Sequence, residues 1–334
     1  MQFSLSGIRQ HFNTAASARA RSVPTGQWLS REEAIMGTAI RVELWCDEPA
    51  DGEAAIDAVM AEMHRIDRTM SPHKAQSELS IINRDAAMRA VPLSDEMANL
   101  IARAIEFSNR SGGAFDITYA SVGHLYDYRR GVRPSDAALA RAREAIGSRH
   151  LLLDSLAKTI RFARDGVRID LGGFAKGHAV DNSVVILKDH DIQHAIVSAG
   201  GDSRVIGDRR GRPWTIAIRD PRRAGEVVAV LPLEDVSIST SGDYERCFEH
   251  DGVRFHHLID PHTGKSPDGV RSVTILADDG LSSEALSKTV FVMGAQRGLE
   301  FIAKQADVDA VIVDAAGALH FSSGLLAGVA PVRQ

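Results

Sequence analysis

Residues 170–181, DLGGFAKGHAVD, combine two adjacent glycines, a lysine, a third glycine and an aspartate at each end. Such a turn can bind phosphate, because free backbone N–H groups and the positive end of the following helix dipole point at the ligand. Neither the Walker A pattern nor G-x-G-x-x-G fits this stretch, so the standard nucleotide-binding motifs are excluded. On its own the stretch indicates either a phosphate-binding turn or an ordinary connection between a strand and a helix.

Further polar segments interrupt the apolar pattern of the chain, and singly each one is explained by turn chemistry. The stretch DPHTG at 260–264 fits a type I turn with Pro261 at its second position. Aspartate beside glycine is equally typical of turns. The segments lie at 36–38, 70–83, 112–118, 198–202, 239–246 and 256–267.

Turn chemistry explains each segment singly, but packing does not explain why so many of them occur together. Sites are built where strands end and loops converge, and four aspartates lie close to glycine or proline at the ends of apolar stretches. They are Asp170, Asp202, Asp243 and Asp260. Carboxylates, histidines, hydroxyls and glycine amides together suit a polyphosphate ligand, which is usually held with Mg²⁺. The pattern therefore predicts a site for such a ligand.

The composition excludes several classes of protein. The chain has 334 residues and a net charge of −5, which argues against a nucleic-acid-binding face. Its two cysteines, Cys46 and Cys247, lack the spacing of a zinc site or a disulfide framework. No apolar run approaches the ~18 residues of a membrane span, and the N-terminal segment has no apolar core of a secretory signal. We expect residues 1–30 to be a disordered leader and the protein to be cytoplasmic.

The elements that carry these segments divide into a helix-rich first part and a sheet-rich second part. Helices are expected over 52–69, from an N-cap at Ser94, over 135–147, and after Asp170 and Ser282. Short strands in succession indicate antiparallel neighbours rather than βαβ units, so the predicted fold class is α+β. The expected strands are 38–45, 159–162, 167–171, 195–199, 214–218, 227–233, 236–240 and 272–276.

Eight motifs follow one another from about residue 34 to about residue 325: MGT, SELSIIN, FDIT, IDLGGFAKGHAVD, AGGD, STSGDYER, HHLIDPHTG and EALSKTVFVMG. In their order and spelling the sequence resembles the ApbE family, the FAD:protein FMN transferases. The resemblance implies one ApbE-like domain over 31–330, with mixed or antiparallel sheets flanked by helices. FAD is expected between the helix-rich and sheet-rich parts. The implied activity splits FAD at its pyrophosphate, releases AMP and joins FMN to a Thr or Ser hydroxyl of an acceptor flavoprotein.

The resemblance also implies roles for individual residues. Asp170 is expected to contact FAD, Lys176 to lie close to the nucleotide, and the carbonyl of Gly173 to face a metal ion. His73 departs from the family, which usually has an aromatic residue such as Tyr at that position. Further FAD contacts are implied at Met36, His73, Ala114, Phe115, Asp116 and Leu258.

The implied reaction needs a base, because an acceptor hydroxyl is a poor nucleophile near neutral pH. His257 is the candidate for that base, and Asp260 or Asp243 is expected to orient its ring. Negative charge rises on the pyrophosphate as the bond to AMP breaks, so a cation or a cluster of donors is expected beside it.

The last motif departs from the family pattern Asp-Ala-x-x-Thr, whose carboxylate and hydroxyl help to bind Mg²⁺. Here the two positions are Glu284 and Lys288. By spacing alone, Glu followed four residues later by Lys is typical of an exposed helical ion pair. The resemblance instead places Gly173, Glu284 and Ser287 at the metal. Because a protonated lysine cannot bind Mg²⁺ and could itself neutralise phosphate, we expect Lys288 to reduce the dependence on Mg²⁺.

The N-terminal segment also lacks the signal peptide and lipid-anchor cysteine of the exported relatives, which favours an acceptor flavoprotein inside the cell. Two alternatives to FMN transfer remain open. Water could replace the acceptor hydroxyl, which would make the protein an FAD pyrophosphatase that gives FMN and AMP. The protein could also bind FAD without catalysis. Release of AMP without an acceptor indicates the first alternative, and binding without release of AMP indicates the second.

Overall fold

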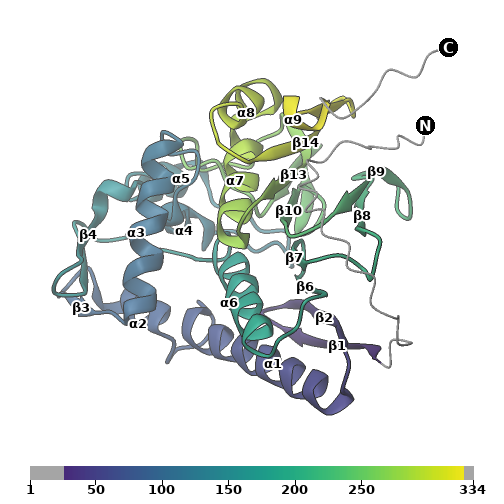
Figure 1. The fold of residues 1–334 in the computed structure, drawn as a ribbon. Coiled ribbons are helices and arrows are strands. Elements are labelled where there is room, and N and C mark those ends of the chain that lie inside the picture. Colours follow the sequence, from purple (N-terminus) through teal and green to yellow (C-terminus); the bar gives the residue numbers. More distant parts are fainter. Residues whose placement is uncertain (1–25, 327–334) are drawn as a thin grey trace.

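A computed structural model describes residues 26–326 of the chain (Figure 1). Its largest sheet has eight strands in the order β1-β2-β6-β7-β10-β13-β14-β15, and each neighbouring pair is antiparallel. The predicted α+β class is therefore confirmed. The strands are β1 (Gln27–Ile35), β2 (Thr38–Cys46), β6 (Ala195–Ala199), β7 (Asp202–Ile206), β10 (Ser237–Gly242), β13 (Val270–Ala277), β14 (Asp309–Asp314) and β15 (Leu319–Phe321).

Two helices, α6 (Ala175–Asp189) and α7 (Gly280–Met293), lie in the middle of the molecule (Figure 1). They contact each other, and α7 also packs on β10 and β13 while α6 packs on β6 and β7. The long helix α1 (Pro49–Met70) lies against α6 and the β1–β2 hairpin, and α8 (Ala295–Ile302) lies against α7 and β14. Within residues 26–326, no helix combines the length and the apolar character needed to cross a membrane.

The helix-rich part lies on the side of α6 and α7 that faces away from the large sheet (Figure 1). A small antiparallel sheet, β3-β5-β4, belongs to it, and two hairpins, β8–β9 and β11–β12, stand apart from both sheets. The remaining elements are α2 (Glu78–Asp85), β3 (Val91–Pro92), α3 (Asp95–Arg110), the 3-10 turn η1 (Ile117–Tyr119), α4 (Ala120–Gly123), α5 (Asp136–Arg143), the 3-10 turn η2 (Ser148–His150), β4 (Leu151–Asp154), β5 (Thr159–Phe162), β8 (Trp214–Arg219), β9 (Val227–Leu233), β11 (Cys247–His250), β12 (Val253–His256) and α9 (Ser323–Leu326).

Local sequence explains where several elements begin. The Ser94 hydroxyl accepts a hydrogen bond from the Met97 amide at 3.1 Å and so caps α3, as predicted. Ser135 caps α5 in the same way. In β2 the alternating Ile40, Val42 and Leu44 are fully buried, which confirms the predicted half-buried strand.

Several predicted boundaries are wrong. The expected leader ended at residue 30, but β1 begins at Gln27; residues 1–25 of that leader lie outside the described part. The helix expected over 135–147 ends at Arg143, four residues early. Among the described residues, the elements that were not predicted are β1, α2, β3, β4, β7, β11, β12, α8, β14, β15 and the short helical turns.

The stretch 167–171 is not a strand, although its sequence alternates like one. Side chains satisfy its backbone in place of a neighbouring strand. The Asn83 amide of α2 bonds the Ile169 N–H and C=O, both at 2.8 Å. Ser121 accepts from the Arg168 N–H at 3.0 Å. The stretch is therefore an extended segment held between α2 and α4, which leads directly to the DLGG turn and α6.

Close packing explains the third glycine of the DLGGFAKG turn. A Cβ placed on Gly177 would lie 2.2 Å from the carbonyl oxygen of Gly280, at the start of α7. A Cβ on Gly280 would lie 2.6 Å from the carbonyl oxygen of Gly177. The first turns of α6 and α7 therefore meet backbone to backbone, which only glycine allows.

We expect Gly177→Ala to lower the free energy of unfolding by about 1–3 kcal/mol, because the added methyl group pushes two backbones apart. Urea unfolding measures this loss. Gly269→Ala is the matched control, since a Cβ there would meet nothing within 4 Å. Equal unfolding midpoints for the two variants would contradict the close approach of α6 and α7.

Candidate active site

The DLGG turn joins the extended segment 167–171 to the N-terminus of α6. The Asp170 amide donates to the Ile117 carbonyl at 3.0 Å, and its carboxylate accepts from the Gly172 amide at 2.5 Å. Burial raises the pKa of Asp170, and the bond from Gly172 opposes that rise. The stretch does connect an extended segment to a helix, as one interpretation of the sequence expected, and phosphate binding at the N-terminus of α6 stays a prediction.

Four charged side chains meet behind this turn, and we call them the charged tetrad. They come from α6, β7 and α7 and are Lys176, Asp202, Glu284 and Lys288. Lys176 Nζ contacts the Asp202 carboxylate and lies 2.6 Å from Glu284 Oε1. Lys288 Nζ lies 3.3 Å from Glu284 Oε1 and 3.9 Å from Asp202 Oδ1. The tetrad has no net charge and ties the sheet to both central helices.

The carboxylates of the tetrad are buried, with Asp202 2% and Glu284 0% exposed. Burial alone would raise the pKa of Asp202, but Lys176 and Lys288 outweigh burial and lower it. Burial alone would lower the pKa of Lys176, but Asp202 and Glu284 outweigh it and raise that pKa. Both groups are therefore charged at neutral pH.

Glu284 and Lys288 do form the ion pair that their spacing predicts, but the prediction that this pair is exposed is wrong. The reason is the place of α7, which packs on the sheet on one side and on α6 and α8 on others. A four-residue spacing carries no information about which face of a helix meets solvent. That information comes from the tertiary packing.

Three serine hydroxyls form a hydrogen-bond network next to the tetrad. Ser239 donates to Asp202, and Ser287 bonds Ser241 at 2.8 Å and Ser239 at 3.1 Å. The Ser287 hydroxyl also donates to the Glu284 carbonyl at 2.8 Å. Ser287, an implied metal ligand, is therefore engaged in this hydroxyl network.

The described residues do not fit a Mg²⁺ ion in this arrangement. Glu284 Oε1 faces two ammonium groups and its Oε2 accepts from the Gly177 amide at 2.7 Å. The methylene chain of Lys288 lies alongside Gly173, within 3.6–3.7 Å of where a Cβ on that glycine would be. No group of three or more His, Cys, Asp or Glu side chains suited to a metal occurs within residues 26–326. An ammonium group thus stands beside the implied ligands.

His257 is half-buried next to the tetrad, in the segment that follows β12. Burial lowers its pKa to about 3, and the nearby charges of Arg246, Lys288 and Lys176 act in the same direction. The ring is therefore neutral at neutral pH. Its Nδ1 atom is buried and has no hydrogen-bond partner in the described part of the chain.

Neither carboxylate expected to orient His257 bonds its ring in this structure. Asp243 instead forms a two-pronged ion pair with Arg222, with one contact of 2.7 Å. Asp260 accepts from the His262 amide at 2.9 Å and so shapes the DPHTG turn. The orienting role predicted for these two aspartates has no support in this geometry.

The remaining implied FAD contacts surround the same region. Met36 lies in the β1–β2 turn with a positive φ of 54°, and His73 is exposed between α1 and α2. The Asp116 carboxylate is used inside the protein, where it accepts from the Thr118 and Ser148 amides. It therefore shapes the loop, and any contact to a ligand falls to its backbone. Ala114, Phe115 and Leu258 are buried.

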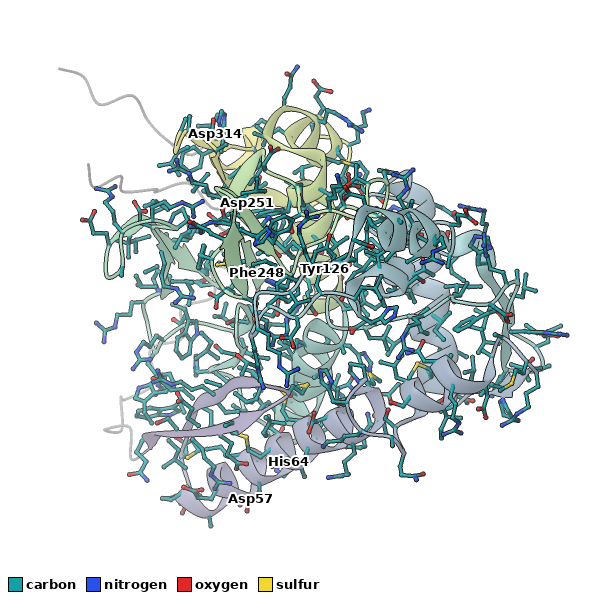
Figure 2. All side chains as sticks on the ribbon, turned by 180° about the vertical axis from the view of Figure 1, so that it is seen from behind. Asp57, His64, Tyr126, Phe248, Asp251 and Asp314 are labelled. Carbon is teal, nitrogen blue, oxygen red and sulfur yellow. The ribbon has the colours of Figure 1, made fainter. Side chains whose placement is uncertain are left out.

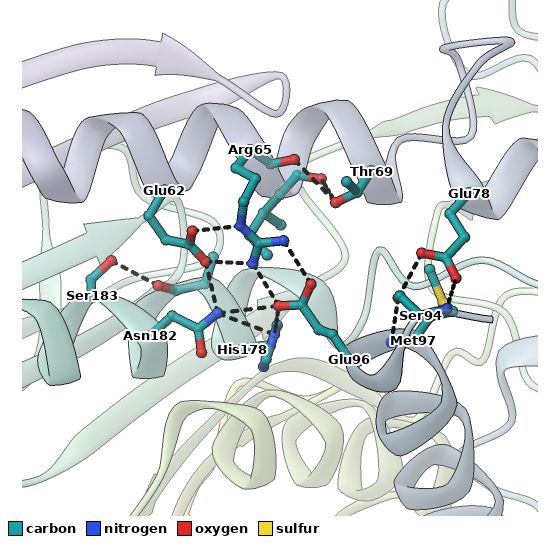
Figure 3. Close-up of polar contacts among 12 residues, drawn as sticks. Glu62, Arg65, Thr69, Glu78, Ser94, Glu96, Met97, His178, Asn182 and Ser183 are labelled. Carbon is teal, nitrogen blue, oxygen red and sulfur yellow. Dashed lines mark hydrogen bonds and ion pairs between the residues drawn. The ribbon is translucent and has the colours of Figure 1, made fainter. Parts of the chain in front are cut away.

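A polar network behind α6 fixes that helix against α1 and α3 (Figure 3). Arg65 of α1 bonds both oxygens of Glu96 of α3 at 2.6 and 2.7 Å. His178 of α6 bonds Glu96 at 2.8 Å, and Asn182 bonds Glu62 at 2.8 Å. The bond from Arg65 is the largest cause that lowers the pKa of Glu96 to about 2. His178 and Asn182 thereby set the rotation of α6 that turns Lys176 toward the sheet.

We expect Glu284→Gln to lower the free energy of unfolding by about 3–5 kcal/mol, because two buried ammonium groups would then share one carboxylate. Chemical denaturation at neutral pH measures the loss. Glu249→Gln is the control; it breaks an exposed pair with Arg254, worth about 0–1 kcal/mol. If Glu284→Gln costs no more than this control, the tetrad does not hold the central helices.

Comparisons with known proteins identify the family of the chain. The model of the ApbE family matches residues 36–312, which include the DLGG turn and the charged tetrad. The FAD:protein FMN transferase of Treponema pallidum is 31% identical over 316 residues, which cover 89% of this chain and 87% of that protein. That of Haemophilus influenzae is 32% identical, over 80% of this chain and 82% of that protein.

Solved structures share the fold. The ApbE protein of Thermotoga maritima superposes with a TM-score of 0.84 at 32% identity, covering 91% of this chain and 100% of that one. The flavin transferase ApbE of Vibrio cholerae gives a TM-score of 0.79 at 28% identity, covering 90% and 99%. With the family match across most of its length, this chain belongs to the ApbE family.

Proposed function

We propose that this protein transfers the FMN part of FAD to a Thr or Ser hydroxyl of an acceptor flavoprotein, releasing AMP. The observation that carries the proposal is the meeting of the DLGG turn, the charged tetrad and a neutral histidine at one place in the fold. Curated relatives that share most of this chain are named for the same activity.

His257 and the N-terminus of α6 have different roles in such a reaction. The acceptor oxygen attacks the phosphorus of the FMN half, and the bond from that phosphorus to the bridging oxygen of AMP breaks. AMP leaves with that oxygen. The proton of the acceptor hydroxyl passes to a ring nitrogen of His257, which is neutral and free to accept it. The N-terminus of α6 faces the phosphates and favours their negative charge.

We expect His257→Ala to slow FMN transfer by about 10²–10⁴-fold, the usual contribution of a general base. FAD affinity should change little. The measurements are AMP release, with and without acceptor, and the mass of the acceptor. His250→Ala, an exposed histidine of β11, is the control. Because the pKa of His257 in the free protein is about 3, the parent's kcat/KM should show no loss between pH 8 and 5 from this group.

Other outcomes of the same assay separate the alternatives. AMP release that needs no acceptor would make the protein an FAD pyrophosphatase. FAD binding with no AMP in any condition would make it a carrier. A His257→Ala variant that transfers FMN at the parent rate would leave His257 as a packing residue.

The second part of the proposal concerns charge at the pyrophosphate. Relatives with the Asp-Ala-x-x-Thr pattern are expected to use Mg²⁺ there, which would neutralise the phosphates. Here the ammonium group of Lys288 lies 3.3 Å from Glu284 Oε1, and the methylene chain of Lys288 lies alongside Gly173. In our proposal Lys288 supplies the positive charge and Glu284 holds it in place, so that the reaction depends less on Mg²⁺.

Lys288→Thr should therefore make transfer depend on Mg²⁺ more strongly than in the parent. The hydroxyl replaces the ammonium group, which opens room for a cation beside Glu284. Transfer rate against Mg²⁺ concentration, with a chelator as the zero point, measures the effect. Lys265→Thr, in the turn that follows His257, controls for the loss of a lysine. A parent that is inactive in chelator and fully restored by Mg²⁺ would overturn the idea.

A cytoplasmic location remains a prediction from the N-terminal sequence, most of which lies outside the described residues. Fractionation of cells that produce the full chain tests it. Recovery of the protein with the membrane or outside the cell would redirect the search for its acceptor.

A further inference from the structure

Arg246 carries a guanidinium group that faces the site and has no side-chain partner among the described residues. It lies in the loop between β10 and β11 and was not singled out in the sequence. Its Nη2 atom lies 3.6 Å from where a Cβ on Gly37 would be, so the side chain reaches across to the β1–β2 turn. The backbone carbonyl of Arg246 accepts a hydrogen bond from the His257 amide at 3.0 Å. This bond holds the backbone of Arg246 next to the candidate base.

Tyr119 is a second polar side chain of the site with no hydrogen bond in the described part of the chain. It ends the turn η1, and its hydroxyl oxygen lies 3.9 Å from where a Cβ on Gly172 would be. Burial raises its pKa well above the usual value, and the nearby charge of Asp170 adds to the rise. Tyr119 therefore remains a neutral phenol whose hydroxyl lies near the DLGG turn and has no hydrogen-bond acceptor among residues 26–326.

An aromatic cluster supports this tyrosine from behind. Tyr126 and Tyr128 stack with ring centroids 5.7 Å apart, and Phe248 and Phe255 stack at 5.3 Å. Tyr126 and Phe248, labelled in Figure 2, come from distant parts of the chain and lie near each other in the structure. The Tyr128 hydroxyl is buried and also lacks a partner in the described part. Tyr119 is partly buried and packs against this cluster.

The charges around these two residues identify the ligand chemistry. The positive charge of Arg246 acts to lower the pKa of Asp170, of Tyr119 and of His257, and its guanidinium group lies near Gly37. The lysines of the tetrad are already paired with buried carboxylates, whereas the exposed side chain of Arg246 has no partner within residues 26–326. A guanidinium group with free parallel N–H donors matches phosphate oxygens, and a neutral O–H adds a directed bond to the same anion. Together they supply a guanidinium donor near Gly37 of the β1–β2 turn and a hydroxyl donor near Gly172 of the DLGG turn.

We infer that Arg246 and Tyr119 bind the pyrophosphate of FAD, with Arg246 reaching it from the β10–β11 loop beside Gly37 and Tyr119 from η1 beside Gly172. This inference rests on the proposed function and adds two binding residues to it. The phosphates satisfy both free donors and add negative charge beside His257. That charge counters the cations that keep the pKa of His257 low, so FAD itself prepares the histidine to accept a proton.

The test is FAD titration of the full-length protein carrying Tyr119→Phe or Arg246→Gln, followed by flavin fluorescence. Each variant should raise the Kd for FAD about tenfold to a hundredfold, the usual loss for a hydrogen bond to a charged group. Arg246→Lys should recover part of the affinity. Tyr126→Phe, whose hydroxyl donates to the Gly264 carbonyl, and Arg254→Gln, which pairs with Glu249, are the controls.

A thermal unfolding curve accompanies each titration, because a purely structural role would lower Tm together with affinity. Unchanged FAD affinity in both variants, or a loss of affinity that only follows a loss of Tm, would overturn the inference. AMP release by the parent keeps this outcome separate from the proposed function. If the parent releases no AMP while both variants bind FAD weakly, the function fails and the binding residues stand.

Discussion

The burial of four charges between β7, α6 and α7 is the constraint on which the rest of the site depends. Two carboxylates and two ammonium groups can leave water only when each finds a partner of opposite sign at close range. That requirement fixes the distance between the sheet and both helices. It also explains why Gly177 and Gly280 meet without side chains, because Glu284 must come close enough to accept from the Gly177 amide.

The sequence predicted the elements whose signals are local. The buried alternation of β2 and the serine caps of α3 and α5 depend on neighbours in the chain, and each of them is confirmed. The stretch 167–171 was mispredicted because its backbone is satisfied by the side chain of Asn83, which lies 86 residues away. The motifs located the DLGG turn, but the burial of Glu284 follows from the packing of α7. Tyr119 and Arg246 lie within or beside recognised motifs, yet only the fold places their side chains beside Gly172 and Gly37.

In this account the charges of the site have separate tasks. Asp202 and Glu284 neutralise Lys176 and Lys288 in the ligand-free protein. These two lysines therefore orient the helices and add no net positive charge to the site. Arg246 has no ion-pair partner in the described part of the chain, and in our proposal it supplies the attraction for an anion. His257 stays uncharged in this cationic surrounding, and in our proposal the negative charge of the phosphates raises its pKa. Such a division lets a chain that carries Lys288 beside the implied metal ligands hold a pyrophosphate with its own side chains.

Titration calorimetry of FAD into the full-length protein, in chelator and then in excess Mg²⁺, tests this central claim most directly. If side chains alone neutralise the pyrophosphate, FAD binds in chelator, and Mg²⁺ changes its affinity by no more than about twofold. Failure to bind FAD in chelator, with full recovery in Mg²⁺, would contradict the account. Glu284 would then be a metal ligand from which Lys288 turns away when FAD binds.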